Sequence, residues 1–238
     1  MMKKSLKQLL NDAAEKYETT VFIHSDPIQF PHRYSCKEDI EVSAFVSAWM
    51  AYGSRKVFLK ILDVLHSEMD KYGGPYKYIM DGGFLIHNNV SNDTLYRFYK
   101  WSDYIHLAGR IQDVLKANGT LESESVELRR LFSGINGIPL ENSTSANKRL
   151  NMFLRWMVRV GSPVDFGLWS SISPSNLIIP LDTHVYQEAL RLGLTNRKCA
   201  DIKTATEITD HMKEFWPDDP VRGDFALYGI GINRLTSL

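Results

Sequence analysis

Residues 178–194 read IIPLDTHVYQEALRLGL, and the interpretation of the whole chain starts from this stretch. An apolar and proline-containing approach leads to Asp182, and an amphipathic pattern then runs from Thr183 to Leu192 until Gly193 interrupts it. An aspartate directly before a helical pattern is a preferred N-cap, because its carboxylate accepts a hydrogen bond from a free amide of the first turn. The residues alone therefore predict a helix that begins after Asp182 and ends near Gly193.

The same helical periodicity recurs on both sides of this stretch. Apolar residues return at steps of three and four along most of the chain, whereas the alternation typical of a half-buried strand is weak everywhere. The sequence therefore predicts an all-α protein of about ten helices. The expected helices span residues 3–18, 39–50, 57–72, 91–100, 103–117, 126–132, 146–160, 183–192, 204–215 and 221–230.

Composition narrows the functional classes. The chain has 238 residues, which suits one domain or one domain built as two lobes. Lys plus Arg and Asp plus Glu both number 28, so the overall basic field typical of nucleic-acid-binding proteins is absent. Cys36 and Cys199 are too few for a disulfide scaffold or for a four-thiolate iron–sulfur cluster. No apolar run reaches the length of a signal peptide or a membrane-spanning helix, so we expect a cytoplasmic protein without membrane contact.

Charge is nevertheless distributed unevenly along the chain. Residues 145–159 hold four positive side chains and no negative one, and Lys148, Arg155 and Arg159 fall along one edge of the expected helix. Residues 207–224 instead hold six acidic side chains against two basic ones. Two interpretations remain open: a basic ridge suited to phosphates, or a helix face that pairs with acids elsewhere.

Three segments resemble one known superfamily. The segment Pro180–Val185, followed by a helix that closes at 191–194, resembles the segment after the helix-hairpin-helix in DNA glycosylases of the endonuclease III type. The interval from Lys148 to Asp182 is more similar to that of archaeal 8-oxoguanine glycosylases. Residues 218–231 resemble the closing helix of an uncharacterised bacterial family within or beside this superfamily.

This resemblance implies a fold and a domain arrangement. We expect an all-α, two-lobed glycosylase-like fold with a DNA-binding cleft between the lobes. One lobe would be the middle helical lobe, residues 40–170, and the other would combine residues 1–39 with 171–238. One motif departs from the family pattern, because the usual Leu-Pro-Gly-Val-Gly hairpin is replaced by residues 132–145, in which Gly134 and Gly137 keep two turn positions.

The resemblance also implies site residues. Asp182 matches the catalytic carboxylate, which stabilises the positive charge that develops on the sugar as the base departs. Lys148 matches the lysine whose amine attacks the sugar and forms a Schiff base. Further residues are expected to contact DNA: the turn of Tyr52, Gly53 and Ser54 that separates the base pairs, the cations Arg149, Arg155 and Arg159, and the side chains Trp156 and His184. As a purely structural alternative, Asp182 is only a helix cap and His184 only a hydrogen-bonded structural histidine.

The expected activity is removal of a damaged base, for example an oxidised purine, from duplex DNA, with strand cleavage where Lys148 forms the Schiff base. The expected protein is monomeric and nucleoid-associated, binds no metal and needs no cofactor. Two other classes remain open. A non-catalytic nucleic-acid-binding module would keep the fold without base release, and a helical protein-interaction domain would have no affinity for DNA.

Overall fold

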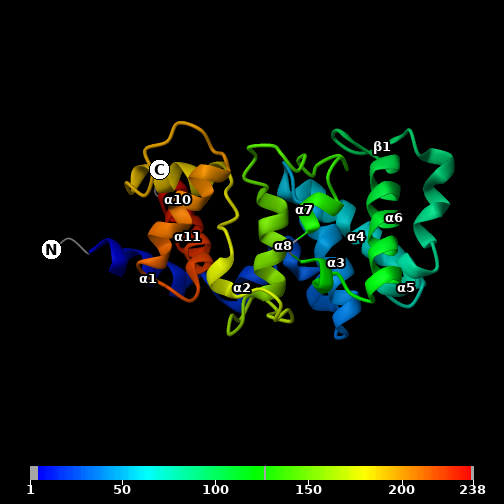
Figure 1. Cartoon of the computed structure of the whole chain (residues 1–238), viewed down its shortest axis with the longest axis horizontal. Coiled ribbons are helices and arrows are strands. Elements are labelled where there is room, and N and C mark those ends of the chain that lie inside the picture. Colours follow the sequence, from blue (N-terminus) through cyan, green and yellow to red (C-terminus); the bar gives the residue numbers. More distant parts are fainter. Residues whose placement is uncertain (1–4, 126, 237–238) are drawn as a thin grey trace. The chain divides into compact units, whose positions relative to one another are not determined.

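The computed structural model describes residues 5–125 and 127–236, and these are mostly helical. Figure 1 follows the chain through its helices, and the described strands form one two-stranded antiparallel sheet. The chain divides into two compact units. One unit is Ser25–Ser143, and the other combines Met1–His24 with Thr144–Leu238.

The unit Ser25–Ser143 is organised around α3, in which every residue from Ile40 to Met50 is buried. The acidic residue Glu41 in this helix is fully buried, and its carboxylate accepts hydrogen bonds from Thr120 Oγ1 at 2.6 Å and the Leu121 amide at 3.0 Å. The elements of this unit are η1 (Pro27–Gln29), η2 (Pro31–Arg33), α3 (Lys37–Met50), α4 (Arg55–Lys71), α5 (Pro75–Met80), η3 (Gly83–Val90), β1 (Thr94–Tyr96), β2 (Tyr99–Lys100), α6 (Trp101–Asn118), η4 (Glu122–Glu124) and α7 (Leu128–Leu131).

The other unit joins the two ends of the chain. Its first helix, α1, packs along its last helix, α11, and the two lie together in Figure 1. Gly229 makes this approach possible, because a Cβ atom there would lie 2.1 Å from the Tyr17 ring. The elements of this unit are α1 (Leu6–Tyr17), α2 (Thr20–Ile23), α8 (Lys148–Val158), η5 (Pro174–Asn176), α9 (Thr183–Arg191), α10 (Ile202–Lys213), η6 (Pro220–Arg222) and α11 (Gly223–Thr236).

The structure confirms the all-α class and corrects two local expectations. The expected helix over residues 91–100 is wrong, since this segment holds a β-hairpin whose paired residues Tyr96 and Tyr99 are both buried. Arg97 turns the hairpin with a left-handed φ of 54°. The expected helix over 126–132 shortens to α7, and Val126 lies outside the described residues.

The boundaries of the two compact units differ from those of the expected lobes, which are residues 40–170 for one lobe and residues 1–39 together with 171–238 for the other. Residues 25–39 belong with the middle of the chain, and residues 144–170, including α8, belong with the terminal helices. The expected site residues Lys148 and Asp182 therefore share one unit. Within the described part of the chain, no helix combines the length and apolar character needed to span a bilayer.

Candidate functional site

Asp182 lies at the start of α9 and caps it, as the sequence predicts. Its Oδ1 accepts a hydrogen bond from the Val185 amide at 2.9 Å. Its other carboxylate oxygen has no protein partner within residues 5–125 and 127–236, and the side chain is partly exposed. One oxygen therefore fixes the carboxylate, and the other is available to a ligand.

Lys148 is the first residue of α8, two residues after the start of the helix expected over 146–160. The N-cap is Asn147 in the left-handed conformation, whereas Ser145 accepts the Asn147 amide at 3.1 Å and shapes the preceding turn. Lys148 is a partly buried residue, and its ammonium has no hydrogen bond or ion pair with any described residue. A partly buried amine without a direct partner is uncommon where the role is purely structural.

Asp224 lies in the first turn of α11 and joins these two residues electrostatically. Helices α9 and α11 pack together, with Glu188 against Gly231 toward one end. Asp182 and Asp224 interact at the starts of the same two helices, so the helices run parallel and both carboxylates lie at one end. The pKa of Asp224 is raised to about 6 by burial and by Asp182, against the lowering effects of Arg155 and Lys148.

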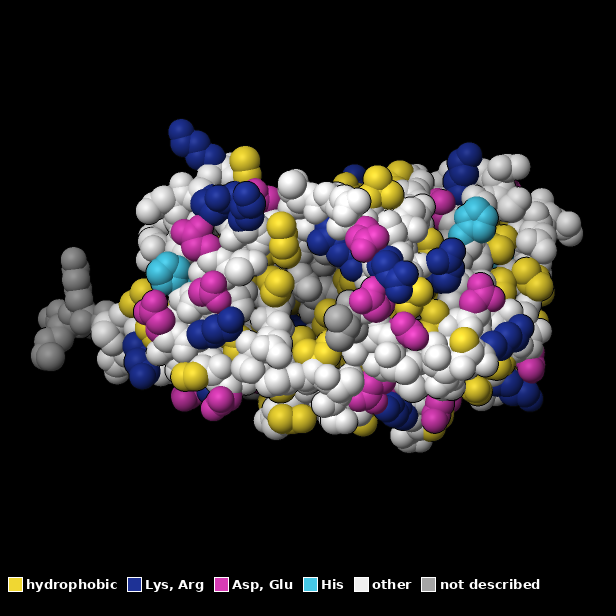
Figure 2. All heavy atoms as spheres, viewed as in Figure 1, with side chains coloured by type: hydrophobic (Ala, Val, Ile, Leu, Met, Phe, Trp, Pro, Cys, Tyr) yellow, Lys and Arg dark blue, Asp and Glu magenta, His cyan; other side chains and the backbone are white. Residues whose placement is uncertain are grey.

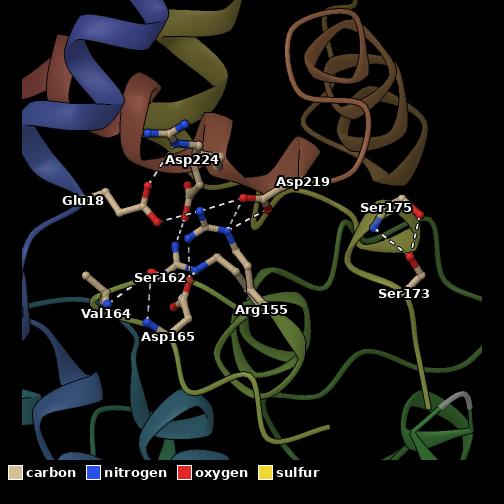
Figure 3. Close-up of polar contacts among 11 residues, drawn as sticks. Glu18, Arg155, Ser162, Val164, Asp165, Ser173, Ser175, Asp219 and Asp224 are labelled. Carbon is tan, nitrogen blue, oxygen red and sulfur yellow. Dashed lines mark hydrogen bonds and ion pairs between the residues drawn. The ribbon is translucent and has the colours of Figure 1, made fainter. Parts of the chain in front are cut away.

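Asp224 belongs to a buried network of charged side chains (Figure 3). The Arg155 side chain is 4% exposed and donates to both Asp224 and Asp165. The Arg159 side chain is 3% exposed and binds Asp165 at 2.9 Å, Asp219 at 2.7 Å and Glu18 at 2.6 Å. These contacts tie the C-terminal half of α8 to the end of α1 and the start of α11.

The loop after α8 holds Asp165 in this network. Ser162 Oγ accepts hydrogen bonds from the amides of Val164 at 3.1 Å and Asp165 at 3.2 Å. The Phe166 amide then donates to the Trp156 carbonyl at 2.7 Å, which satisfies a free carbonyl at the helix end. The Asp165 carboxylate is fully buried, and burial raises its pKa against the lowering effects of Arg155 and Arg159.

The network carries slightly more negative than positive charge. Four carboxylates, from Glu18, Asp165, Asp219 and Asp224, face three guanidinium groups, from Arg155, Arg159 and Arg222. With every group ionised, four negative and three positive charges leave one negative charge in excess. Desolvation favours removal of that excess by proton uptake, and Asp224 combines a raised pKa with partial access to solvent at 15% side-chain exposure.

Three of the expected DNA-contacting residues are buried instead. Arg155 and Arg159 were expected to bind phosphates, but their guanidinium groups are fully engaged with carboxylates inside the unit. Trp156 was expected to stack on a base, but its side chain is fully buried. Arg155 and Arg159 are four residues apart, so the helical period places both on one side of the helix, toward the start of α11 and the loop after α8. On the face drawn in Figure 2, Lys and Arg side chains lie among Asp and Glu side chains.

The other expected contacts are accessible. His184 is exposed in the first turn of α9, and Arg149 is partly exposed in the first turn of α8. Tyr52, Gly53 and Ser54 form an exposed turn between α3 and α4, in the unit Ser25–Ser143. The segment that replaces the family hairpin forms a series of tight turns, with positive φ at both Gly134 and Gly137.

Sequence reasoning missed Asp224 as a site residue, although this residue lies in the acidic segment 207–224. The signal was the charge segregation. An acid-rich segment and an acid-free basic segment in one neutral chain predict that the two segments pair, and Asp219 and Asp224 do pair with the two arginines of α8. Glu18 and Asp165 gave no signal in the sequence, since neither lies in a biased segment.

A family profile matches the chain, whereas individual curated proteins and solved structures do not. Among the described residues, no group of three or more His, Cys, Asp or Glu side chains is arranged to hold a metal ion. The chain belongs to DUF2400, a family of proteins of unknown function, whose sequence profile matches residues 26–135 and 127–233.

Proposed function

We propose that the protein is a DNA glycosylase of the helix-hairpin-helix type that removes a damaged base and cleaves the abasic strand through Lys148. The observation that carries this proposal is that one unit holds both the Lys148 amine, which has no partner among the described residues, and the half-anchored carboxylate of Asp182, and that the charges of both act on Asp224. The two-lobed glycosylase-like fold and damaged duplex DNA as the substrate belong to the same proposal.

The chemistry suits these two groups. As the bond from the base to C1′ of the sugar breaks, positive charge develops on the sugar, and the free oxygen of Asp182 can stabilise it. The capping hydrogen bond keeps the carboxylate oriented before the reaction, so little reorganisation accompanies the step. The Lys148 amine then forms the Schiff base with C1′ that permits strand cleavage. The free amine is the reactive form, and no competing ion pair holds the ammonium in place.

A non-catalytic nucleic-acid-binding module fits the structure less well. Such a module depends on exposed cations that neutralise phosphates. Arg155 and Arg159 are buried in ion pairs with carboxylates, so the basic segment 145–159 has few cations left for phosphate contacts. Lys148 and Asp182, in contrast, keep reactive atoms available.

The test is borohydride trapping on duplex oligonucleotides that carry an abasic site or an oxidised purine. Wild-type protein is expected to form a covalent adduct, and Lys148→Ala to form none. Asp182→Asn is expected to reduce base release at least 100-fold while thermal stability changes little, because the amide oxygen still caps α9.

Lys203→Ala supplies the matched control. Lys203 is an exposed lysine in the first turn of α10, which also has an aspartate N-cap, so the substitution removes an amine from a similar local position. It is expected to trap like wild type. Adduct formation that survives in Lys148→Ala, or base release that survives in Asp182→Asn, would contradict the assigned roles. Salt-dependent DNA binding without base release on any lesion would instead identify a binding module.

A further inference from the structure

Asp224 has the arrangement of a group that exchanges a proton. Arg155 binds its Oδ2, while its Oδ1 has no protein partner in the described part of the chain. The carboxylate therefore has the same half-anchored form as Asp182. Its side chain is 15% exposed, more than those of Arg155 and Asp165 in the same network and less than that of Asp219. A purely structural partner of Arg155 does not require a free oxygen or a neighbouring amine.

We propose that Asp224 is the proton acceptor that converts the Lys148 ammonium into the reactive amine. This inference rests on the function proposed above and adds to it a third ionisable residue. In this step an N–H bond of the ammonium breaks, and the proton reaches Oδ1 of Asp224 through one bridging water molecule, because no direct hydrogen bond or ion pair joins the two described side chains. The lone pair left on Nζ then forms a bond to C1′ of the sugar. The bond from C1′ to the base breaks, and its electron pair leaves with the base.

The surroundings of Asp224 adjust it for this role. From α8, Arg155 and Lys148 favour its ionised form; from the start of α9 and the loop after α8, Asp182 and Asp165 favour its protonated form. Arg159 and Glu18 lie one contact further away, on Asp165. With a pKa of about 6, Asp224 is mostly ionised at pH 7.5 and can accept a proton, yet it is a stronger base than an ordinary carboxylate.

The sign of one substitution separates proton transfer from simple electrostatics. Asp224→Asn removes a negative charge near the Lys148 ammonium, and charge removal alone favours the free amine and so speeds adduct formation. Loss of a proton acceptor slows adduct formation, by about 100-fold for a typical general base. We expect the slower rate in single-turnover trapping at pH 7.5. We also expect loss of the wild-type decline in rate below about pH 6, while Asp224→Glu restores part of the rate.

Asp219→Asn is the matched control. Asp219 belongs to the same network and binds Arg159, but it is not among the largest influences on the pKa of Asp224. It is expected to keep the wild-type rate within about threefold and to keep the pH profile. An Asp224→Asn variant that is faster than wild type, equal to it, or only as slow as Asp219→Asn overturns the proposal.

A titration without DNA separates this inference from the proposed function. Carbon-13 NMR of the Asp224 carboxyl in the whole protein is expected to show a midpoint near pH 6, lower in Asp182→Asn and higher in Lys148→Met. A midpoint below pH 4.5, or one that neither substitution moves, refutes the role of Asp224 even where wild-type protein forms adducts. Absence of any adduct with wild-type protein refutes the proposed function, whatever the titration shows.

Discussion

Replacing Arg159 with methionine is expected to destabilise the protein strongly. Arg159 is 3% exposed and makes hydrogen bonds or ion pairs with three carboxylates, those of Glu18, Asp165 and Asp219. Methionine fills much of the volume but leaves the fully buried Asp165 with Arg155 as its remaining cation. Removal of one partner from a buried ion pair costs about 3–5 kcal/mol, because the remaining charge stays desolvated. For a chain of this size the loss corresponds to a fall in Tm of about 6–20 °C.

The assay is urea unfolding and calorimetry of the wild type and Arg159→Met between pH 5 and 8. The deficit of the variant is expected to narrow as the pH falls, because the stranded carboxylates are neutralised by protonation. Arg149→Met provides the comparison, since Arg149 is partly exposed on the same helix and surface substitutions usually change stability by under about 0.5 kcal/mol. A deficit below about 1 kcal/mol for Arg159→Met, the value of an exposed pair, would refute the reasoning.

Two further predictions concern the unit Ser25–Ser143. Burial lowers the pKa of His66 from 6.5 to about 4, and the neutral ring bonds Ser43 Oγ and the Leu62 carbonyl, each at 2.7 Å. His66 therefore takes up a proton below pH 6.5 in the unfolded chain but only near pH 4 in the native state. The free energy of unfolding consequently falls as the pH is lowered from 6.5 to about 4. At pH 5 the free energy of unfolding is lower by about 2 kcal/mol for this reason. Urea unfolding of His66→Gln should therefore show a decrease between pH 7 and pH 5 that is smaller than that of the wild type by this amount. Equal decreases would contradict the assignment. Gly53→Ala places a side chain at φ +77° and 2.5 Å from the Arg97 guanidinium, whereas Gly134→Ala meets only a left-handed backbone at φ +84°. Both should cost about 1–2 kcal/mol, with Gly53→Ala the more costly, and a larger cost for Gly134→Ala would argue against the close approach of the two turns.

The sequence predicts most helices because their signals are local. Apolar periodicity and caps such as Asp182 act within one or two turns, and α9 begins where they indicate. The hairpin at Thr94–Lys100 could not be predicted from local periodicity, because it is stabilised by contacts with residues more than 40 positions away in the sequence. Tyr96 donates a hydrogen bond to the Tyr52 carbonyl at 2.9 Å, and Tyr99 to the Trp49 carbonyl at 3.1 Å. A three-residue strand has too little periodicity to reveal itself without those partners.

The site divides in the same way. Lys148 and Asp182 could be proposed from sequence, because each lies at the start of a helix and each resembles a glycosylase motif. The destination of the α8 arginines depends on tertiary pairing, since a helix that carries Arg155 and Arg159 on one edge is compatible with solvent, phosphate or buried acids. In the structure both arginines are buried and pair with acidic side chains, and Asp224 from the acidic segment 207–224 is a partner of Arg155.

These pairings give the two ends of α8 different tasks. At its C-terminal half, Arg155 and Arg159 are held by carboxylates from three other segments, which fixes the helix against α11 and the end of α1. At its N-terminus, Lys148 has no such restraint from any described residue, and its charge acts on Asp224 together with that of Asp182. A rigid support beneath a movable amine is the arrangement that positioning a nucleophile requires, because precision comes from the scaffold and reach from the side chain. Arg155 and Arg159, which could have formed part of a DNA-binding ridge, are instead paired with carboxylates inside this unit.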